Sequence, residues 1–288
     1  MIIDKNTIIK TQHGKPILVD LFYLKNKQNK PIVIFCHGYK GFKDWGAWDL
    51  MAKTFANAGF LFIKFNFSHN GGTIEQPIDF PDLEAFAHNN YTKELNDLDT
   101  VISWVFKNSV ISKEGNLKAI SLIGHSRGGG IVAIKAEEDS RIKALIGLAS
   151  VSDFKSRFPT GEAFTSWQQN GVYYVVNGRT KQNMPHYFQF YEDFAKNEEH
   201  LTIKRAVSKL NIPYLIIHGD DDSSVRIEEA KELHKWRPDS TLKIIANANH
   251  VFGASHPWDK PILPEQLKTV INQIITFIKD LTFYIEGK

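Results

Sequence analysis

The 288 residues are 42% hydrophobic and 23% charged, the composition of a globular protein with a sizeable core rather than of a disordered chain. The 35 basic and 32 acidic side chains give a net charge of +3, and the lysines are spread along the chain rather than gathered in a run. Nucleic acid is therefore not an expected partner, because phosphate binding requires a concentrated basic surface.

The chain shows no signal for export or for a membrane. Its first ten residues lack the continuous apolar stretch of a signal peptide, and no segment approaches the ~18 apolar residues of a membrane span. Cys36 is the only cysteine, so it cannot form an internal disulfide, and we expect it to be a small buried hydrophobic residue. We therefore expect a cytoplasmic protein without a membrane partner, and a homodimer is left open.

Predicted strands and helices alternate along most of the chain. Strands are expected at Thr7–Lys10, Ile17–Leu24, Ile32–Cys36, Phe60–Phe67, Ala119–Ile123, Ala144–Leu148, Tyr214–Ile217 and Leu242–Ala246. Helices are expected at Trp48–Ala58, Tyr91–Lys107, Gly128–Glu137, Arg226–Trp236 and Glu265–Leu281. This alternation predicts an α/β fold in which residues 1–288 form one domain, with a mostly parallel central sheet flanked by helices.

One segment, Asp153–Ala195, interrupts the alternation. Eleven of its 43 residues are aromatic, against 12% for the whole chain. Within it, Val172–Val176 and Arg179–Gln182 read as the strands of a hairpin, because Asn177-Gly178 between them suits a two-residue type I′ turn. We interpret residues 153–205 as a cap inserted in the domain and lying over the sheet. The alternative is that its aromatic side chains only build a small core of their own.

The segment Gly124-His125-Ser126-Arg127-Gly128 matches the pattern G-x-S-x-G. It follows a predicted strand at once and runs directly into a predicted helix. So sharp a turn places the central residue in a strained backbone geometry and leaves its hydroxyl exposed, while the helix N-terminus favours negative charge nearby. Ser126 is therefore the candidate nucleophile.

A second short motif, His37-Gly38-Tyr39, follows the strand Ile32–Cys36. In this arrangement the loop after that strand supplies a backbone N–H that stabilises an oxyanion, so the path of the backbone matters more than the side chain. We assign the two donors to the N–H groups of Tyr39 and Arg127. His37 is interpreted as a residue that orders the loop rather than as a base.

Chain order selects the base among the 11 histidines. In this architecture the nucleophile, the acid and the histidine follow one another along the chain. Only His234, His250 and His256 lie beyond the acidic cluster that follows the strand Tyr214–Ile217. His234 falls inside a helix and His256 lies farther out, whereas His250 lies in a short loop after a strand. We therefore assign the base to His250.

Three consecutive carboxylates, Asp220, Asp221 and Asp222, are candidates for the acid. Three like charges so close are unfavourable unless some are paired or well solvated. One carboxylate should hold the Nδ1 atom of His250, and the others are expected to cap the helix that starts near Arg226. We favour Asp222 and keep Asp220 as the second choice.

At this point the chain resembles the α/β-hydrolase superfamily over nearly its whole length. More narrowly, it resembles small bacterial esterases that include the feruloyl and cinnamoyl esterases. The residues that carry this resemblance are the elbow Gly124–Gly129, the set His218, Gly219, Asp222 and Val225, which fits H-G-x-x-D-x-x-V, and the turn Asn247–His250. Those relatives often carry Gln where Arg127 stands here, and an inserted hairpin cap is a shared trait. The resemblance implies that the chain cleaves carboxylic esters with aryl or short to medium acyl groups.

Two alternatives remain beside a carboxylic ester hydrolase acting on a small-molecule ester. The same three residues serve acyl-peptide hydrolases, thioester hydrolases and acyltransferases, although peptidases of this kind usually carry a further large domain. A non-catalytic ligand receptor on the same fold is the alternative of another class. The histidine and aspartate residues are scattered, without the spacing of metal ligands. No glycine-rich phosphate-binding loop follows the first strand either, so neither a metal nor a cofactor is expected.

Overall fold

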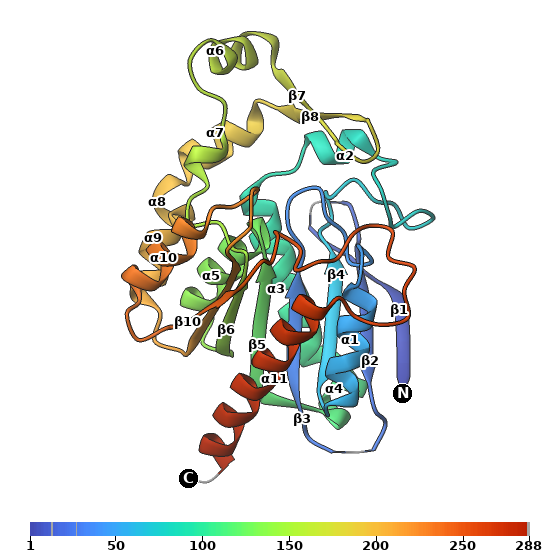
Figure 1. The fold of residues 1–288 in the computed structure, drawn as a ribbon. Coiled ribbons are helices and arrows are strands. Elements are labelled where there is room, and N and C mark those ends of the chain that lie inside the picture. Colours follow the sequence, from blue (N-terminus) through green and yellow to red (C-terminus); the bar gives the residue numbers. More distant parts are fainter. Residues whose placement is uncertain (13, 27, 287–288) are drawn as a thin grey trace.

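The computed structural model describes residues 1–12, 14–26 and 28–286 and contains one central sheet of eight strands (Figure 1). The strands lie in the order β1-β2-β4-β3-β5-β6-β9-β10. Their bounds are β1 Ile2–Ile9, β2 Ile17–Tyr23, β4 Leu61–Asn66, β3 Lys30–Cys36, β5 Gly115–His125, β6 Ile142–Leu148, β9 Tyr214–Gly219 and β10 Thr241–Ile245. The pairs β1–β2 and β2–β4 are antiparallel, and the remaining pairs are parallel. The predicted α/β architecture with a mostly parallel sheet is confirmed.

Helices cover both faces of the sheet, which explains the continuous apolar runs in the sequence. One apolar cluster joins α1 (Trp48–Asn57) and α11 (Glu265–Glu286) to one face (Figure 1). A second cluster joins four helices to the other face: α3 Tyr91–Lys107, α5 Arg127–Glu138, α9 Ile203–Lys209 and α10 Ile227–Trp236. Two short helices, α2 (Leu83–Ala87) and α4 (Ser109–Glu114), were not expected from the sequence. No helix in the described part of the chain is both long and apolar enough to cross a membrane.

The segment between β6 and β9 departs from the alternation, as expected. It contains η1 Lys155–Arg157, α6 Gly161–Asn170, β7 Val172–Val176, β8 Asn183–Tyr187, α7 Gln189–Lys196, α8 Glu198–Leu201 and α9. Figure 1 shows α6 and the β7–β8 hairpin standing apart from the central sheet, beyond the ends of its strands, with β8 next to α2. Several of its aromatic side chains, among them Phe158, Trp167 and Phe194, join the main apolar core.

The predicted hairpin turn was wrong in its position. The second strand is Asn183–Tyr187 rather than Arg179–Gln182, so six residues and not two connect the strands. The side chain of Asn177 is the physical reason. Its Oδ1 atom accepts hydrogen bonds from the N–H groups of Arg179 (3.0 Å) and Thr180 (3.4 Å). These bonds stabilise a wider loop, so that strand pairing resumes only at Asn183.

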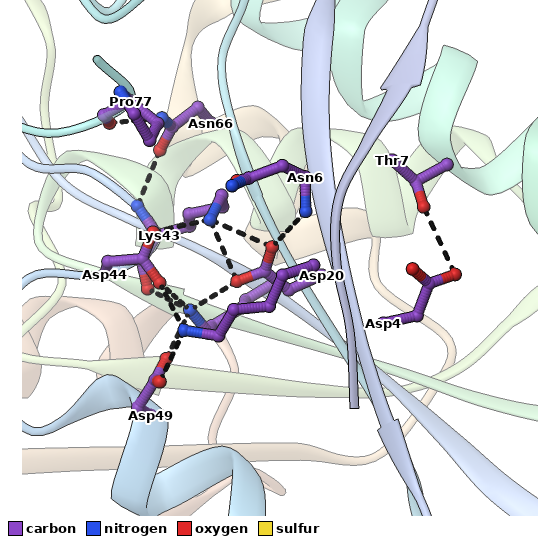
Figure 2. Close-up of polar contacts among 11 residues, drawn as sticks. Asp4, Asn6, Thr7, Asp20, Lys43, Asp44, Asp49, Asn66 and Pro77 are labelled. Atoms are coloured by element: carbon purple, nitrogen blue, oxygen red, sulfur yellow. Dashed lines mark hydrogen bonds and ion pairs between the residues drawn. The ribbon is translucent and has the colours of Figure 1, made fainter. Parts of the chain in front are cut away.

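A buried group of charged side chains ties the antiparallel edge of the sheet to the loop that follows β3 (Figure 2). The carboxylate of Asp20, on β2, is fully buried. It accepts from the ammonium groups of Lys43 at 2.9 Å and Lys64 at 2.8 Å, and from the N–H of Asn6 at 2.9 Å. Lys64 also pairs with Asp44 and with Asp49 of α1. We call the set Asp20, Lys43, Asp44, Asp49 and Lys64 the ionic cluster.

The ionic cluster also fixes the backbone of the loop after β3. The N–H of Lys43 donates to Asn66 Oδ1 at 2.6 Å, and its carbonyl accepts from Lys64 at 2.9 Å. Burial alone would raise the pKa of Asp44, but the charges of Lys64 and Lys43 hold it well below its usual range. Because the pKa of Asp44 is lower in the folded than in the unfolded protein, its ionisation stabilises the fold. This stabilisation is fully present above pH ~4 and is lost as the pH falls through the folded-state pKa.

We expect Asp20→Asn to lower the free energy of unfolding by about 3–5 kcal/mol, because it removes the fully buried counter-charge of two buried ammonium groups. Urea denaturation followed by circular dichroism measures the change. The control is Asp4→Asn on the neighbouring strand, where the carboxylate is exposed and accepts a long hydrogen bond of 3.4 Å from Thr7 (Figure 2). Equal stability of the two variants would show that the ionic cluster is not needed for the fold.

Candidate active site

Ser126 lies at the turn between β5 and α5, in a backbone conformation that serine rarely adopts. Its φ is 57° and its ψ is −121°. Both backbone groups of Ser126 are hydrogen-bonded and stabilise this conformation. The Ser126 N–H donates to the carbonyl of Leu148 at 2.9 Å, and the Ser126 carbonyl accepts from the N–H groups of Gly129 at 3.0 Å and Val151 at 3.2 Å. The end of β6 therefore fixes the Ser126 backbone.

Two glycines allow this turn to close. A Cβ atom on Gly124 would lie 2.3 Å from the carbonyl oxygen of Gly128, and one on Gly128 would lie 2.6 Å from that of Cys36. Both distances are far inside van der Waals contact, and both obstacles are backbone atoms that cannot rotate away. The glycines of the G-x-S-x-G motif are therefore required for packing between β5, α5 and β3.

His250 and Asp222 are brought together by the ends of two neighbouring strands. His250 Nδ1 lies 2.7 Å from Asp222 Oδ2. The other carboxylate oxygen of Asp222 accepts from the N–H groups of Ser224 at 2.8 Å and Val225 at 2.9 Å, and His218 Nε2 lies 3.4 Å from Oδ2. The Asp222 side chain is thus fully buried and held at both of its oxygens.

The electrostatics of this pair define the tautomer of the histidine. Burial would raise the pKa of Asp222, but hydrogen bonds from His218, His250 and the Val225 N–H together hold it well below its usual range. An ionised carboxylate can only accept, so His250 Nδ1 carries a proton and donates it. In the neutral ring Nε2 is then left with a lone pair and can act as a base.

The other two carboxylates of the acidic cluster lie elsewhere. Asp220 is exposed and its Oδ1 accepts from the N–H of Asn247 at 2.6 Å, while Asp221 is also exposed. The expectation that they cap the following helix was wrong, because α10 begins at Ile227 without any side-chain cap. The cause is the loop path: the backbone at Asp220 and Asp221 is hydrogen-bonded to the turn after β10 instead.

The loop after β3 packs directly against the serine. A Cβ atom on Gly38 would lie 2.8 Å from Ser126 Cβ, so only glycine allows this approach. Tyr39 follows at once. His37 is buried, with Nδ1 donating to the carbonyl of Gly38 at 2.9 Å and Nε2 accepting from the N–H of Phe67 at 3.4 Å. Burial lowers the pKa of His37 to about 4. The structure places His37 as an element of the loop, as expected.

Ser126 and His250 line a single cavity of about 630 Å³. No hydrogen bond joins Ser126 Oγ to His250 within the described residues, and such contacts are often long in a protein without substrate. Tyr39 and Arg127 also line the cavity. The inserted segment contributes most of the aromatic wall, through Phe154, Phe158, Trp167, Tyr173 and Phe190.

The family model described as "alpha/beta hydrolase fold" matches residues 31–179, just over half of the chain. The chain belongs to the α/β hydrolase family. It is also similar to the non-heme chloroperoxidase CPO-A1 of Kitasatospora aureofaciens, at 23% identity over 88% of this chain and 97% of the relative.

Solved structures share the fold of this α/β hydrolase. Est1E from Butyrivibrio proteoclasticus superposes with a TM-score of 0.66 at 18% identity, covering 99% of this chain and 100% of the other. The esterase domain of a Rhodothermus marinus protein gives a TM-score of 0.59 at 17% identity, covering 88% and 91%. The expected resemblance to bacterial esterases is confirmed at the level of fold.

The sequence reasoning did not predict the contacts of two side chains near the serine. His125 is buried, and its Nε2 lies 2.8 Å from the carbonyl oxygen of His250, so it braces the loop that carries that histidine. Burial lowers the pKa of His125 to about 3. Arg127 extends to Glu94 of α3 at 3.1 Å and lies over the ring of Tyr39 at 4.3 Å. The sequence identified Arg127 by its position after the nucleophile, but its partner Glu94 could not have been found without the fold.

No group of three metal ligands lies at Ser126 among the residues that the structure describes. Within the described residues, one cluster of three carboxylates is close enough together to hold a metal ion. It consists of Asp20, Asp44 and Asp49, whose oxygens lie within 4.8 Å of one another. These oxygens already contact the ammonium groups of Lys43 and Lys64 (Figure 2). The lysines thus provide the counter-charge that a cation would otherwise supply.

We expect Asp222→Asn to slow labelling of Ser126 by a fluorophosphonate by ~10³–10⁴-fold, because the amide leaves His250 without its orienting charge. Asp220→Asn is the matched control and should label within about threefold of the wild-type rate. A larger loss in Asp220→Asn than in Asp222→Asn would transfer the role of the acid to Asp220.

Proposed function

We propose that this α/β hydrolase is a serine esterase that cleaves carboxylic esters through an acyl-enzyme on Ser126. One observation carries the proposal: a strained, cavity-lining serine shares its cavity with a histidine whose Nδ1 atom is held at 2.7 Å by a buried carboxylate. A binding protein has no need for that combination. The combination supports acyl transfer, in which a serine, a histidine and a carboxylate act together.

The proposed reaction has two halves. Ser126 Oγ attacks the ester carbonyl while His250 Nε2 takes its proton, and Asp222 stabilises the resulting imidazolium. The N–H groups of Tyr39 and Arg127 stabilise the oxyanion of the tetrahedral intermediate. Its collapse releases the alcohol, protonated by His250, and leaves an acyl group on Ser126. Water, activated by His250, then releases the carboxylic acid by the same steps in reverse.

The cavity wall supports an apolar acyl or aryl group as the substrate. Aromatic side chains provide large apolar surfaces, and binding is favoured by ~25 cal/mol for each Å² of apolar surface that the ligand removes from water. The solved structure of Est1E has also been determined with bound ferulic acid, an aromatic carboxylic acid. Thioester hydrolysis and acyl transfer would use the same three residues, but no contact in the described cavity favours them over ester hydrolysis.

The first test is Ser126→Ala. We expect hydrolysis of 4-nitrophenyl esters to fall by ~10⁴–10⁶ in kcat, with the thermal melting curve unchanged. Ser223→Ala, at an exposed serine next to Asp222, is the control and should keep its activity. A folded Ser126→Ala protein that retains a tenth of the wild-type rate would exclude Ser126 as the nucleophile.

The second test concerns the cap and uses neighbouring residues on opposite faces of β7. Tyr173 lines the cavity, whereas Tyr174 is 56% exposed. We expect Tyr173→Ala to lower kcat/KM about tenfold for 4-nitrophenyl octanoate and much less for the acetate, because only the longer chain reaches this wall. Tyr174→Ala should leave the ratio unchanged. If both variants reduce both substrates equally, the hairpin only supports the fold and does not select substrates.

A further inference from the structure

Lys40 has a backbone conformation that favours glycine. It lies in a tight turn closed by a hydrogen bond of 3.1 Å from the N–H of Gly41 to the carbonyl of Gly38, and its φ is 52°. A residue with a Cβ atom adopts this left-handed region at a cost in free energy. Glycine would fit without strain, so the backbone alone does not explain lysine at this position.

The Lys40 side chain is half-buried and lines the same cavity as Ser126 and His250. Its ammonium group lies 5.0 Å from the centre of the Tyr39 ring. No carboxylate pairs with it in the part of the chain that the structure describes. Burial and the charge of Arg127 lower the pKa of Lys40. The lysine is therefore held in an unfavourable environment that a bound anion would relieve.

The remaining charges of the cavity do not neutralise Lys40. Two further cations line it, and each already has its own carboxylate: Arg127 pairs with Glu94 at 3.1 Å, and Arg157 pairs with Glu229. None of the described residues that line the cavity is an aspartate or a glutamate. The cavity that Ser126 lines thus combines an aromatic wall with one uncompensated positive charge.

We propose that Lys40 binds a carboxylate carried by the substrate, so that the preferred ester has an apolar or aromatic body and a free acid group. The inference rests on the proposed esterase function and narrows its substrate class. A carboxylate beside Lys40 would accept a charge-assisted hydrogen bond in a partly desolvated cavity, where such bonds are stronger than in water. The anion would also compensate the positive charge that the cavity walls leave unbalanced.

The test compares esters that differ only in this group. 4-Nitrophenyl hexanoate, its ω-carboxylate counterpart mono-4-nitrophenyl adipate, and the neutral amide 4-nitrophenyl adipamate place a methyl, a carboxylate or a polar uncharged group at the same position. 4-Carboxyphenyl and 4-carbamoylphenyl hexanoate place the acid and the amide on the leaving group instead. The two series thus show on which side of the ester the carboxylate is recognised.

We expect Lys40→Met to lower the preference for the carboxylate ester over its neutral counterpart by about 10- to 100-fold, mainly through KM, because it removes a charge-assisted bond to the bound substrate. Lys40→Arg should retain most of the preference. Lys40→Gly should lose the preference for the carboxylate ester as Lys40→Met does. It should also raise the melting temperature, because glycine adopts the positive φ of this turn without strain. The neutral ester corrects for any general effect of each substitution.

Lys181→Met is the matched control. Lys181 also has a positive φ, 61°, but it is exposed in the β7–β8 loop, away from the cavity. Its substitution should not change the preference. If the wild-type protein hydrolyses these esters and Lys40→Met leaves the preference unchanged, the inference is wrong and the esterase function stands. If the wild-type protein hydrolyses none of them, the proposed function is wrong and the inference fails with it.

Discussion

The turn at Ser126 is the constraint on which the other parts of the site depend. It closes only because β5, α5 and the end of β3 approach one another at glycines, with backbone atoms where a Cβ would stand at Gly124 and Gly128. The Ser126 N–H donates to the carbonyl of Leu148, and the Ser126 carbonyl accepts from the N–H of Val151, so both bonds hold the strained residue to the end of β6 and the segment after it. A strained conformation persists only where its surroundings determine it. The sheet therefore does more than support the serine, since its strand spacing fixes where the hydroxyl stands.

The loop after β3 connects this turn to the most heavily charged part of the interior. Gly38 at its start packs on Ser126, and Lys43 a few residues later enters the ionic cluster through both its side chain and its backbone. Removing charges from water is costly, and the cluster offsets this cost by pairing each carboxylate with buried ammonium groups. We infer that the ionic cluster keeps the loop, and with it the N–H of Tyr39, at a fixed distance from the serine.

Local patterns predicted the framework and the chain order of the site. Alternation of strands and helices predicted the sheet. The G-x-S-x-G motif selected Ser126 and chain order selected His250, while Asp222 was favoured and Asp220 kept as the second choice. All of these residues follow strands, and the carboxyl ends of parallel strands meet at one edge of the sheet. Contacts between distant segments could not be read in the same way. The pairing of Arg127 with Glu94 and the contact of His125 with the His250 loop both depend on tertiary packing. Sequence periodicity carries no information on such contacts.

The most direct test of the central claim is to trap the covalent intermediate. The wild-type protein is mixed with 4-nitrophenyl octanoate, quenched in acid within the first turnover and digested for peptide mass spectrometry. The account predicts one octanoyl group, on the peptide that contains Ser126, and its disappearance when the quench is delayed until the ester is consumed. Rapid hydrolysis with no acyl group at any time, or an acyl group on another residue, would contradict nucleophilic catalysis by Ser126.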